Sequence, residues 1–165
     1  MIEKGKISQE PFIEILKTLE EAESANLVDW NAMNIASVDQ MNQPSSRMVL
    51  LKKISDDGLV FYTNYNSRKG KEIELNPKVA VNFWWRELKK QIRVEGFIEK
   101  ASEEDSDDYF NSRPLKSRVS AIISNQSSTI SSYEDLKKQM DNYLEQNDES
   151  SIKRPDQCGL YIVIP

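Results

Sequence analysis

Four short segments of the sequence carry basic side chains or small polar donors and acceptors that could bind a ligand. They are Arg47–Lys52, Asn64–Lys71, Tyr109–Ser117 and Ser124–Ser128. Arginine presents a planar fork of N–H donors to an anion, whereas lysine presents one compact charge. Because the formal net charge of the chain is −5, any anion site must be local, built by a few basic residues against an acidic background.

The segment Asn64–Lys71 has the order of residues expected where a helix begins and binds an anion. It follows a predicted strand, and Asn66 or Ser67 is a suitable helix N-cap. The first backbone N–H groups of a helix lack partners within it and carry partial positive charge, to which Arg68 and Lys69 add full charges. A phosphate would fit there. The alternative is a solvated basic turn beside an ordinary capped helix.

Two further segments have simple structural alternatives. Arg47 and Lys52 bracket an apolar strand. They either line an anion site or mark the two ends of a strand at the protein surface. The small donors and acceptors of Ser124–Ser128 follow a predicted helix, where they form either a ligand-binding cluster or a polar loop.

Tyr109, Arg113 and Ser117 recur at intervals of four residues around Pro114. A helix is expected to end at this proline and another to begin, so a bent helical path could direct all three side chains toward one phosphate. The alternative is a helix–helix corner in which Tyr109 packs in the core.

Composition excludes several classes of protein. The 165 residues contain no histidine and one cysteine, Cys158, which removes Ser-His-Asp and Cys-His catalysis, histidine metal sites, an intrachain disulfide and cysteine metal clusters. No Asp/Glu spacing resembles a calcium loop, so we expect no metal site, and we assign no catalytic side chain.

The negative charge argues against nucleic-acid binding, and no apolar run approaches the roughly 20 residues that cross a membrane. We expect a cytoplasmic protein that borrows its chemistry from a cofactor.

Hydrophobic periodicity predicts an α+β fold with a mainly antiparallel sheet. Apolar residues recur at helical spacing over residues 10–26, and the turn Ser55–Gly58 has the composition of a β-hairpin. Predicted strands cover residues 33–38, 47–54, 59–63, 79–85, 91–99 and 160–164, and further predicted helices cover 67–75, 103–111, 114–123 and 133–145. Closely spaced strands with helices at the margins predict a small β-barrel.

We expect one domain over residues 1–165, because the chain is long enough for a substantial core and no interdomain linker interrupts it. Residues 1–27 form its N-terminal helical segment in this prediction. The polar stretch at residues 146–157 is predicted to be a mobile loop.

The order and intervals of these segments resemble those of pyridoxamine 5'-phosphate oxidase. The motifs are Arg-x-Val-Leu-Leu-Lys from Arg47, Phe-Tyr-Thr-Asn from Phe61, Ser-Arg-Lys from Ser67, Tyr-Phe-x-Ser-Arg-Pro from Tyr109 and Gln-Ser-Ser from Gln126. Five motifs in one order are far more specific than any one of them. The resemblance covers residues 28–132 and implies a split β-barrel that binds flavin mononucleotide (FMN) and forms a homodimer with FMN at the subunit interface.

The resemblance also implies a role for each motif. The flavin site would be lined by Arg47, Met48, Val49, Leu50, Leu51, Lys52, Tyr62, Thr63, Gln126 and Ser127. Arg68 and Lys69 would hold the flavin phosphate, and Gln91 would lie near the isoalloxazine ring. The phosphate of the substrate would be bound by Lys52, Tyr109, Arg113 and Ser117. The implied reaction oxidises pyridoxine or pyridoxamine 5'-phosphate to pyridoxal 5'-phosphate, with O2 as acceptor, in vitamin B6 metabolism.

The sequence departs from the family pattern near its end. Pro165 precedes the family's tryptophan and Arg-Leu-His-Asp-Arg motif, and Gln157–Tyr161 stands where the family has Trp-Gly-Gly-aromatic. We therefore expect the family's C-terminal segment to be lacking, either because the protein is short or because the reading frame was cut. Two alternatives to an oxidase follow. One is a non-catalytic protein that binds FMN or pyridoxal phosphate, and the other is a different split-barrel flavin oxidoreductase, such as a flavin reductase.

Overall fold

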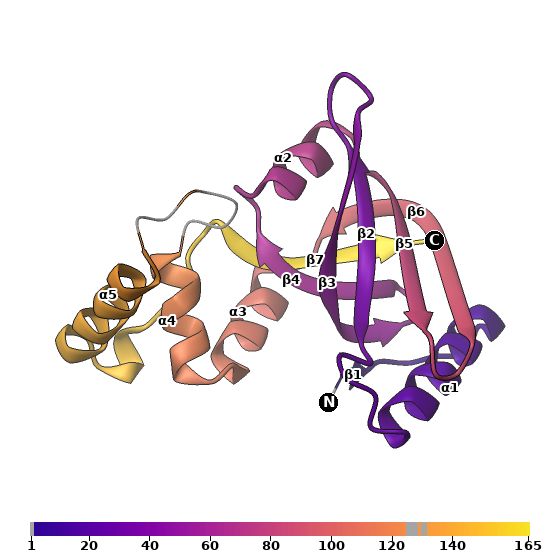
Figure 1. Cartoon of the computed structure of the whole chain (residues 1–165), viewed down its shortest axis with the longest axis horizontal. Helices are drawn as coiled ribbons and strands as arrows, with labels where there is room; N and C mark the ends of the chain where they lie inside the picture. The colour runs from indigo at the N-terminus through magenta and orange to yellow at the C-terminus, as the bar shows by residue number, and fades with distance from the viewer. Residues whose placement is uncertain (1, 125–128, 130–131) are drawn as a thin grey trace. The chain divides into compact units, whose positions relative to one another are not determined.

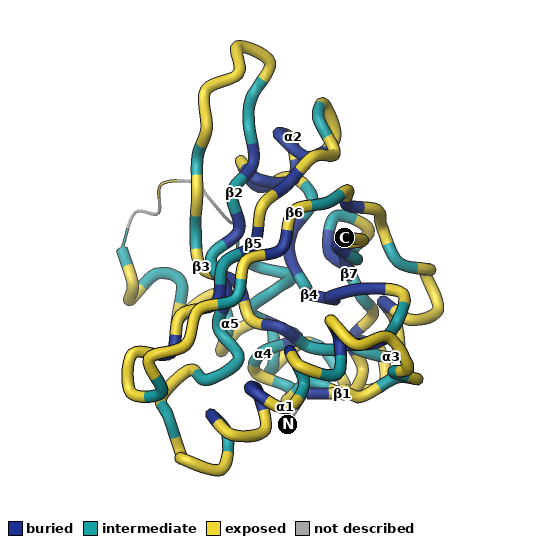
Figure 2. The backbone as a smooth tube through the Cα atoms, turned by 90° about the vertical axis from the view of Figure 1, so that its right-hand side faces the viewer, coloured by how far each residue is buried: buried dark blue, intermediate teal, exposed yellow. Residues whose placement is uncertain are grey.

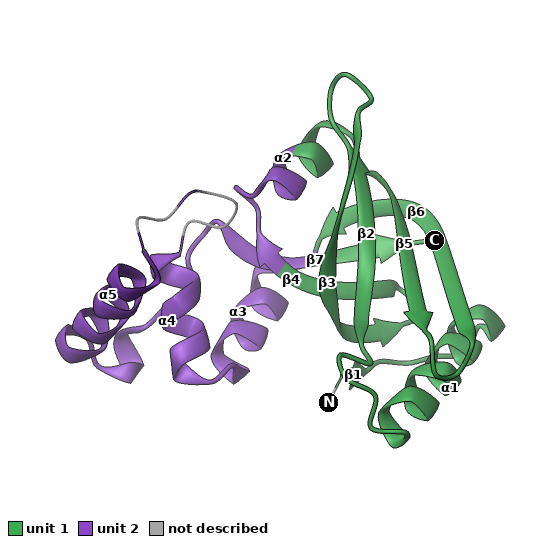
Figure 3. Ribbon diagram, in the orientation of Figure 1, with its two compact units in different colours: residues 1–62, 72–100, 161–165 green, residues 63–71, 101–160 purple. Residues whose placement is uncertain are grey.

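The computed structural model describes residues 2–124, 129 and 132–165. The chain divides into two compact units (Figure 3). Unit 1 comprises residues 1–62, 72–100 and 161–165, and unit 2 comprises residues 63–71 and 101–160. Three elements contribute residues to both units: β4 (Gly58–Asn64), α2 (Arg68–Leu75) and β7 (Cys158–Ile164).

A closed β-barrel forms the framework of unit 1 (Figure 1). Its strands are β2 (Ala32–Val38), β3 (Pro44–Ser55), β4, β5 (Lys78–Trp85), β6 (Lys90–Lys100) and β7. They follow the order β3-β2-β5-β6-β7-β4, and a second pairing, of β3 with β4, closes the ring. The short β1 (Glu3–Lys4), which the sequence did not predict, pairs with β3 in parallel. The predicted α+β barrel with peripheral helices is confirmed.

Alternation of side chains decides which face of each strand lines the barrel. In β5, Val81, Phe83 and Trp85 are buried, whereas Trp84 is 58% exposed. The rings of Phe83 and Trp85 stack with their centroids 5.3 Å apart, and the Trp85 indole N–H donates to the Trp30 carbonyl at 2.7 Å. Figure 2 shows buried and exposed positions along the strands of the barrel.

The connection between β3 and β4 is the tight hairpin that its composition predicts. Ser55 pairs with Gly58 across two turn residues. Gly58 has a φ of +140°, and a Cβ atom there would lie 2.2 Å from the Val163 carbonyl oxygen. Glycine is therefore required both by the backbone conformation and by the close approach of β7.

Helix α1 (Glu10–Ser24) ends two residues before its predicted boundary and buries an apolar face that includes Leu19. Its N-cap residue, Gln9, makes no side-chain capping bond. The Asp56 carboxylate instead accepts from the Ser8 hydroxyl at 2.5 Å, the Ser8 N–H at 2.9 Å and the Gln9 N–H at 3.1 Å. These bonds, chiefly those from Ser8, hold the pKa of Asp56 below its usual value. A residue of the β3–β4 turn thus anchors the start of α1.

The helices of unit 2 are α3 (Glu103–Ser112), α4 (Leu115–Ile123) and α5 (Tyr133–Gln146), followed by the short 3-10 helix η1 (Glu149–Ser151). Each α-helix begins and ends within one residue of its predicted bounds. None of the helices in the described ranges combines the length and the apolar composition needed to cross a bilayer.

Arg154 ties the segment after α5 to α3. Its side chain is 5% exposed and forms ion pairs with Glu103 and with Asp107, the latter at 2.7 Å. It also donates to the Cys158 carbonyl at 2.6 Å. Because Glu103 and Asp107 lie one helical turn apart, a single guanidinium reaches both. The predicted loop at residues 146–157 therefore contains a 3-10 helix and a tethered arginine.

Candidate flavin and substrate site

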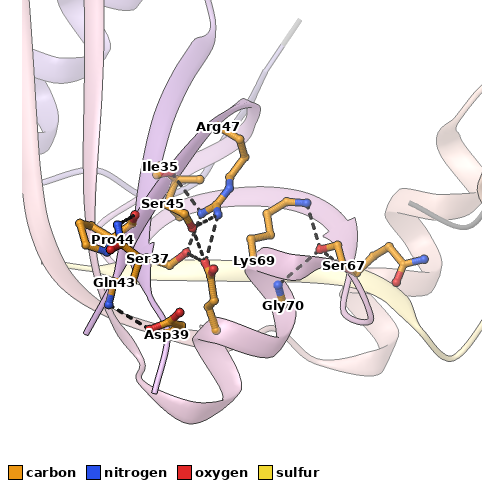
Figure 4. Close-up of polar contacts among 12 residues, drawn as sticks. Ile35, Ser37, Asp39, Gln43, Pro44, Ser45, Arg47, Ser67, Lys69 and Gly70 are labelled. Carbon is orange, nitrogen blue, oxygen red and sulfur yellow. Dashed lines mark hydrogen bonds and ion pairs between the residues drawn. The ribbon is translucent and has the colours of Figure 1, made fainter. Parts of the chain in front are cut away.

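Arg47 forms a partly buried polar cluster with Ser37 and Ser45, which Figure 4 labels, and with Glu72. Its Nη1 donates to Ser37 Oγ at 2.6 Å, and its Nη2 donates to Ser45 Oγ at 2.5 Å and to Glu72 Oε2 at 3.0 Å. Each serine hydroxyl in turn donates to Glu72 Oε2 at 2.6 Å. The side chains of Arg47 and Glu72 are 22% and 5% exposed. The positive and negative charges of this cluster are therefore balanced within unit 1.

Lys52 lies in a β-bulge. Leu51 pairs with Phe61 and Lys53 pairs with Val60, so Lys52 is the extra residue on β3. A bulge bends its strand and redirects the side chain at the extra position, which explains why Lys52 and Lys53 are both partly exposed although they are consecutive. Because β3 extends beyond both Arg47 and Lys52, neither charge marks a strand end.

The apolar residues between Arg47 and Lys52 lie on two faces of β3. Val49 and Leu51 are buried, whereas Met48 and Leu50 are 60% and 41% exposed. The predicted flavin-lining run therefore does not present one continuous side-chain surface.

Gln91 lies on the outward face of β6, opposite Trp84 of β5. Its carboxamide Nε2 donates to Asn82 Oδ1 at 2.8 Å, which fixes the orientation of the amide. Tyr62 and Thr63 follow one another in β4, where Tyr62 is partly exposed and Thr63 is 4% exposed. The boundary between the two units passes between these two residues.

In unit 2, the start of α2 gathers backbone and side-chain donors around Ser67 (Figure 4). Ser67 Oγ accepts from the Gly70 N–H at 3.4 Å, as expected of the predicted N-cap, and from Lys69 Nζ at 3.1 Å. Lys69 is 7% exposed, whereas Arg68 is exposed. A Cβ atom at position 70 would lie 1.9 Å from the Tyr65 carbonyl oxygen, so this turn needs glycine. A helix N-terminus with two cations has the chemistry that holds a phosphate dianion, and these residues therefore fit a phosphate-bearing cofactor.

Tyr109 and Arg113 lie at the end of α3, and Ser117 lies in the first turn of α4. Arg113 is the C-cap of α3, with an extended backbone that leads into Pro114. Phe110 is fully buried while Tyr109 is partly exposed, so Phe110 makes the core contact at this corner. Burial raises the pKa of the Tyr109 phenol, and the charge of Arg113 acts in the opposite direction. The phenol therefore stays protonated at neutral pH and can donate a hydrogen bond.

Gln126 and Ser127 lie outside the described residues. Sequence reasoning missed the partners of Arg47. Ser37 could have been noticed as a hydroxyl within the predicted strand 33–38. Ser45, however, lies before the predicted strand 47–54, and nothing in the sequence links Glu72 to these strands. Among the side chains that the structure describes, no group of three or more Asp, Glu or Cys residues could hold a metal ion.

A sequence profile of the family described as "Pyridoxamine 5'-phosphate oxidase" matches residues 19–146. The chain belongs to the pyridoxamine 5'-phosphate oxidase family. One curated relative, the pyridoxine/pyridoxamine 5'-phosphate oxidase of Nostoc sp., is 47% identical over 97% of this chain and 75% of its own length. Another, the pyridoxine/pyridoxamine 5'-phosphate oxidase 2 of Hydrogenovibrio crunogenus, is 41% identical over 99% of this chain and 77% of its own length.

Two solved structures share the fold of this member of the pyridoxamine 5'-phosphate oxidase family. PhzG from Burkholderia lata, in complex with tetrahydrophenazine-1-carboxylic acid, matches with a TM-score of 0.88 and 25% identity over 96% of this chain and 77% of that chain. A pyridoxamine 5'-phosphate oxidase-related, FMN-binding protein from Nostoc punctiforme matches with a TM-score of 0.76 and 18% identity, over 96% of this chain and 83% of that one. The predicted split-barrel fold is therefore confirmed.

Proposed function

We propose that this protein is an FMN-dependent oxidase that converts pyridoxine or pyridoxamine 5'-phosphate to pyridoxal 5'-phosphate, with O2 as acceptor, in vitamin B6 metabolism. The observation that carries the proposal is the start of α2, where a helix N-terminus lies beside Arg68 and Lys69. The partial positive charge of a helix N-terminus together with two full positive charges favours a phosphate group. The phosphate of FMN would fit there, and the oxidase names of the curated relatives support this choice of ligand.

Bound FMN supplies the ring that accepts a hydride equivalent from the substrate, and the side chains of this protein hold and orient it. Arg68 and Lys69 bind its phosphate in this proposal. The carboxamide of Gln91, held by Asn82, offers its Oε1 to a polar edge of the ring. The strand Arg47–Lys52 lines the site, and the remaining proposed flavin contacts are Tyr62, Thr63, Gln126 and Ser127.

The substrate phosphate has its own set of residues in the proposal. Arg113 supplies a guanidinium fork, and the protonated phenol of Tyr109 donates a hydrogen bond. Ser117 adds a hydroxyl, and Lys52 adds a second positive charge. Together these residues would orient the substrate relative to the flavin, and positioning of two reactants is a large part of the catalysis expected here.

The proposed homodimer would bury an apolar outward face of the barrel. Met48, Leu50, Trp84 and Phe97 on β3, β5 and β6 are 41–60% exposed. All four lie on the outward side of their strands. Pairing through β2 brings Met48 and Leu50 near Trp84, whereas Phe97 lies at the other end of the β5–β6 ladder. Exposed apolar patches of this kind usually mark an interface. We propose that the dimer forms in the cytoplasm.

One observation favours a second candidate, a split-barrel flavin oxidoreductase with another substrate. PhzG, with a TM-score of 0.88 to this chain, is in complex with a tetrahydrophenazine carboxylic acid. The Tyr109, Arg113 and Ser117 set favours a phosphorylated substrate over such a compound. A non-catalytic protein that binds FMN or pyridoxal phosphate is the other alternative.

A single assay separates these candidates. The purified protein would be saturated with FMN and given pyridoxine 5'-phosphate under air, while pyridoxal 5'-phosphate and hydrogen peroxide are followed. We expect both products in equal amounts. Bound FMN without product, even at high protein concentration, would support the binding protein or another oxidoreductase. A protein that takes up no FMN would exclude both oxidoreductases and the FMN-binding protein, and would leave only a protein that binds pyridoxal phosphate.

A further inference from the structure

Tyr65 lies just before the proposed phosphate-binding turn (residues 67–69) and is held at three points. Its backbone N–H donates to the Gln157 carbonyl at 2.6 Å, and its phenol donates to the Leu160 carbonyl at 3.2 Å. Its own carbonyl packs against Gly70, where a Cβ atom would lie 1.9 Å from the carbonyl oxygen. All of these residues belong to unit 2, so the contacts lie within one compact body.

The backbone that receives the Tyr65 phenol is itself tied to α3. Ser106, on α3, is 1% exposed, and its Oγ accepts from the Leu160 N–H at 3.1 Å. The Leu160 carbonyl also accepts from the Ala101 N–H, just before α3, at 2.9 Å. Arg154, earlier in the same segment, adds its two ion pairs to α3. The phenol of Tyr65 therefore bonds to backbone that several other contacts already hold in place.

Gly159 leaves room for the phenol. A Cβ atom at this position would lie 2.1 Å from the Tyr65 hydroxyl oxygen and 3.0 Å from Ser106 Oγ, both shorter than an ordinary van der Waals contact. Burial raises the pKa of the Tyr65 phenol, so the phenol stays protonated at neutral pH and can donate its hydrogen bond. The sequence thus provides a tyrosine, and a glycine opposite it, for one contact beside the phosphate-binding turn.

The start of α2 depends on where Tyr65 lies. The Asn64 carbonyl accepts from the Ser67 N–H at 3.2 Å and from the Ser67 hydroxyl at 2.7 Å, so a tight turn encloses Tyr65. Helix α2 has eight residues, too few to be stable in isolation, so tertiary contacts must hold it. Because only Asn66 separates Tyr65 from Ser67, a displacement of Tyr65 would move the helix N-terminus and Lys69, which bonds to Ser67.

From these contacts we infer that Tyr65 is a positioning residue, which holds the phosphate-binding turn at the start of α2 through its hydrogen bonds to Gln157 and Leu160. It acts on the flavin phosphate through residues 67–69. The inference rests on the proposed FMN site and deepens it.

The test compares the affinities of FMN and riboflavin, which differ by the phosphate alone, in the full-length Tyr65→Phe variant. Phenylalanine keeps the ring and removes the hydroxyl, and the Leu160 carbonyl still accepts from Ala101, so no buried acceptor is left unpaired. We expect the dissociation constant of FMN to rise about fivefold, as for loss of one hydrogen bond, while that of riboflavin changes by less than about twofold. Tyr133→Phe is the matched control, because it removes a hydroxyl from a tyrosine that is 77% exposed. It should leave both affinities unchanged.

A second variant, Gly159→Ala, tests the same contact from the other side. Its Cβ atom should displace the phenol, so the affinity for FMN should fall at least as far as in Tyr65→Phe, again with little change for riboflavin. In the double variant the two losses should be less than additive, because the second change acts on a contact that is already broken. If either single variant does not fold, the other decides by the same criteria.

Three results would overturn the inference while leaving the proposed function intact. Equal weakening of FMN and riboflavin binding would reveal a general structural role for Tyr65. An unchanged dissociation constant for FMN would show that the turn does not depend on the phenol, and fully additive losses in the double variant would show that Gly159 does not act through it. A wild-type protein that binds neither flavin would overturn the inference and the proposed function together.

Discussion

At the scale of single residues, burial distinguishes two lysines that are close neighbours at the start of α2. Lys69 is 7% exposed and contacts the Ser67 hydroxyl, whereas Lys71 is exposed. We expect Lys69→Met to weaken FMN binding by about 10- to 100-fold, because a charge-assisted contact to phosphate contributes about 1.5–3 kcal/mol. Titration of FMN fluorescence measures the change. Lys71→Met is the control, and an equal effect of the two variants would contradict the assignment of the phosphate site.

Arg113 allows the substrate phosphate to be tested separately from the flavin phosphate. Arg113→Ala should raise the KM for pyridoxine 5'-phosphate by at least about tenfold, because a guanidinium–phosphate contact is lost. The affinity for FMN should not change. Lys116→Ala, at an exposed position of α4, should leave both constants unaltered. Parallel loss of FMN and substrate binding would show that Arg113 does not belong to a separate substrate site.

Residue types and spacing could predict the basic segments but not their partners. The four-residue intervals from Tyr109 to Ser117 are visible in the sequence, as is the Ser67 cap. The pairing of Arg47 with Glu72 is not visible, because it depends on how a helix packs against a hairpin 25 positions earlier. The bulge at Lys52 could not be predicted from the sequence for a similar reason. It is a property of how β3 pairs with β4, and the sequence of β3 alone does not specify that pairing.

At the scale of elements, the periodicity of the sequence predicted eleven strands and helices, including the helix at 10–26. Each predicted end lies within three residues of the observed end. These elements have strong alternation, clear capping residues or a tight turn. β1 escaped prediction because it is two residues long and is defined only by its pairing with β3. The hydrogen bonds from Asp56 to the start of α1 were not predicted either, because Asp56 lies more than 45 residues after the backbone groups that it binds.

This anchoring of α1 by Asp56 predicts how stability depends on pH. The pKa of Asp56 is lowered in the folded protein, mainly by the Ser8 bonds, so its contribution is present above its unfolded pKa of about 3.9 and is lost as pH falls through the lower folded value. Asp56→Ala should lower the melting temperature at neutral pH. The difference from wild type should then shrink at pH values below about 4. Asp57→Ala, in the same turn, is the control. A difference that grows on acidification would show that Asp56 acts in another way.

At the scale of the whole molecule, the outward face of the barrel leads to a prediction about assembly. Trp84 is 58% exposed on this face, opposite Gln91. Trp84→Lys would place a charge within the proposed interface, where an unpaired buried charge is costly. We expect the wild-type protein to sediment as a dimer of 19.1 kDa chains and the variant to sediment as a monomer with weakened FMN binding. Tyr133→Lys, at a 77% exposed position of α5, should remain dimeric. A dimeric Trp84→Lys variant would place the interface elsewhere.

The strand order has a consequence for the time course of folding. The hairpins β2–β3, β3–β4 and β5–β6 join neighbours in the chain and can form early, because little entropy is lost in closing their short loops. β7, however, inserts between β6 and β4 after the chain has passed through α3, α4 and α5. Until that insertion, the facing edges of β4 and β6 are unpaired, and Gly58 lacks the β7 backbone that packs against it. Ring closure by β7 should therefore be the slow, late event, and the open-edged intermediate before it is the species most prone to aggregate during synthesis.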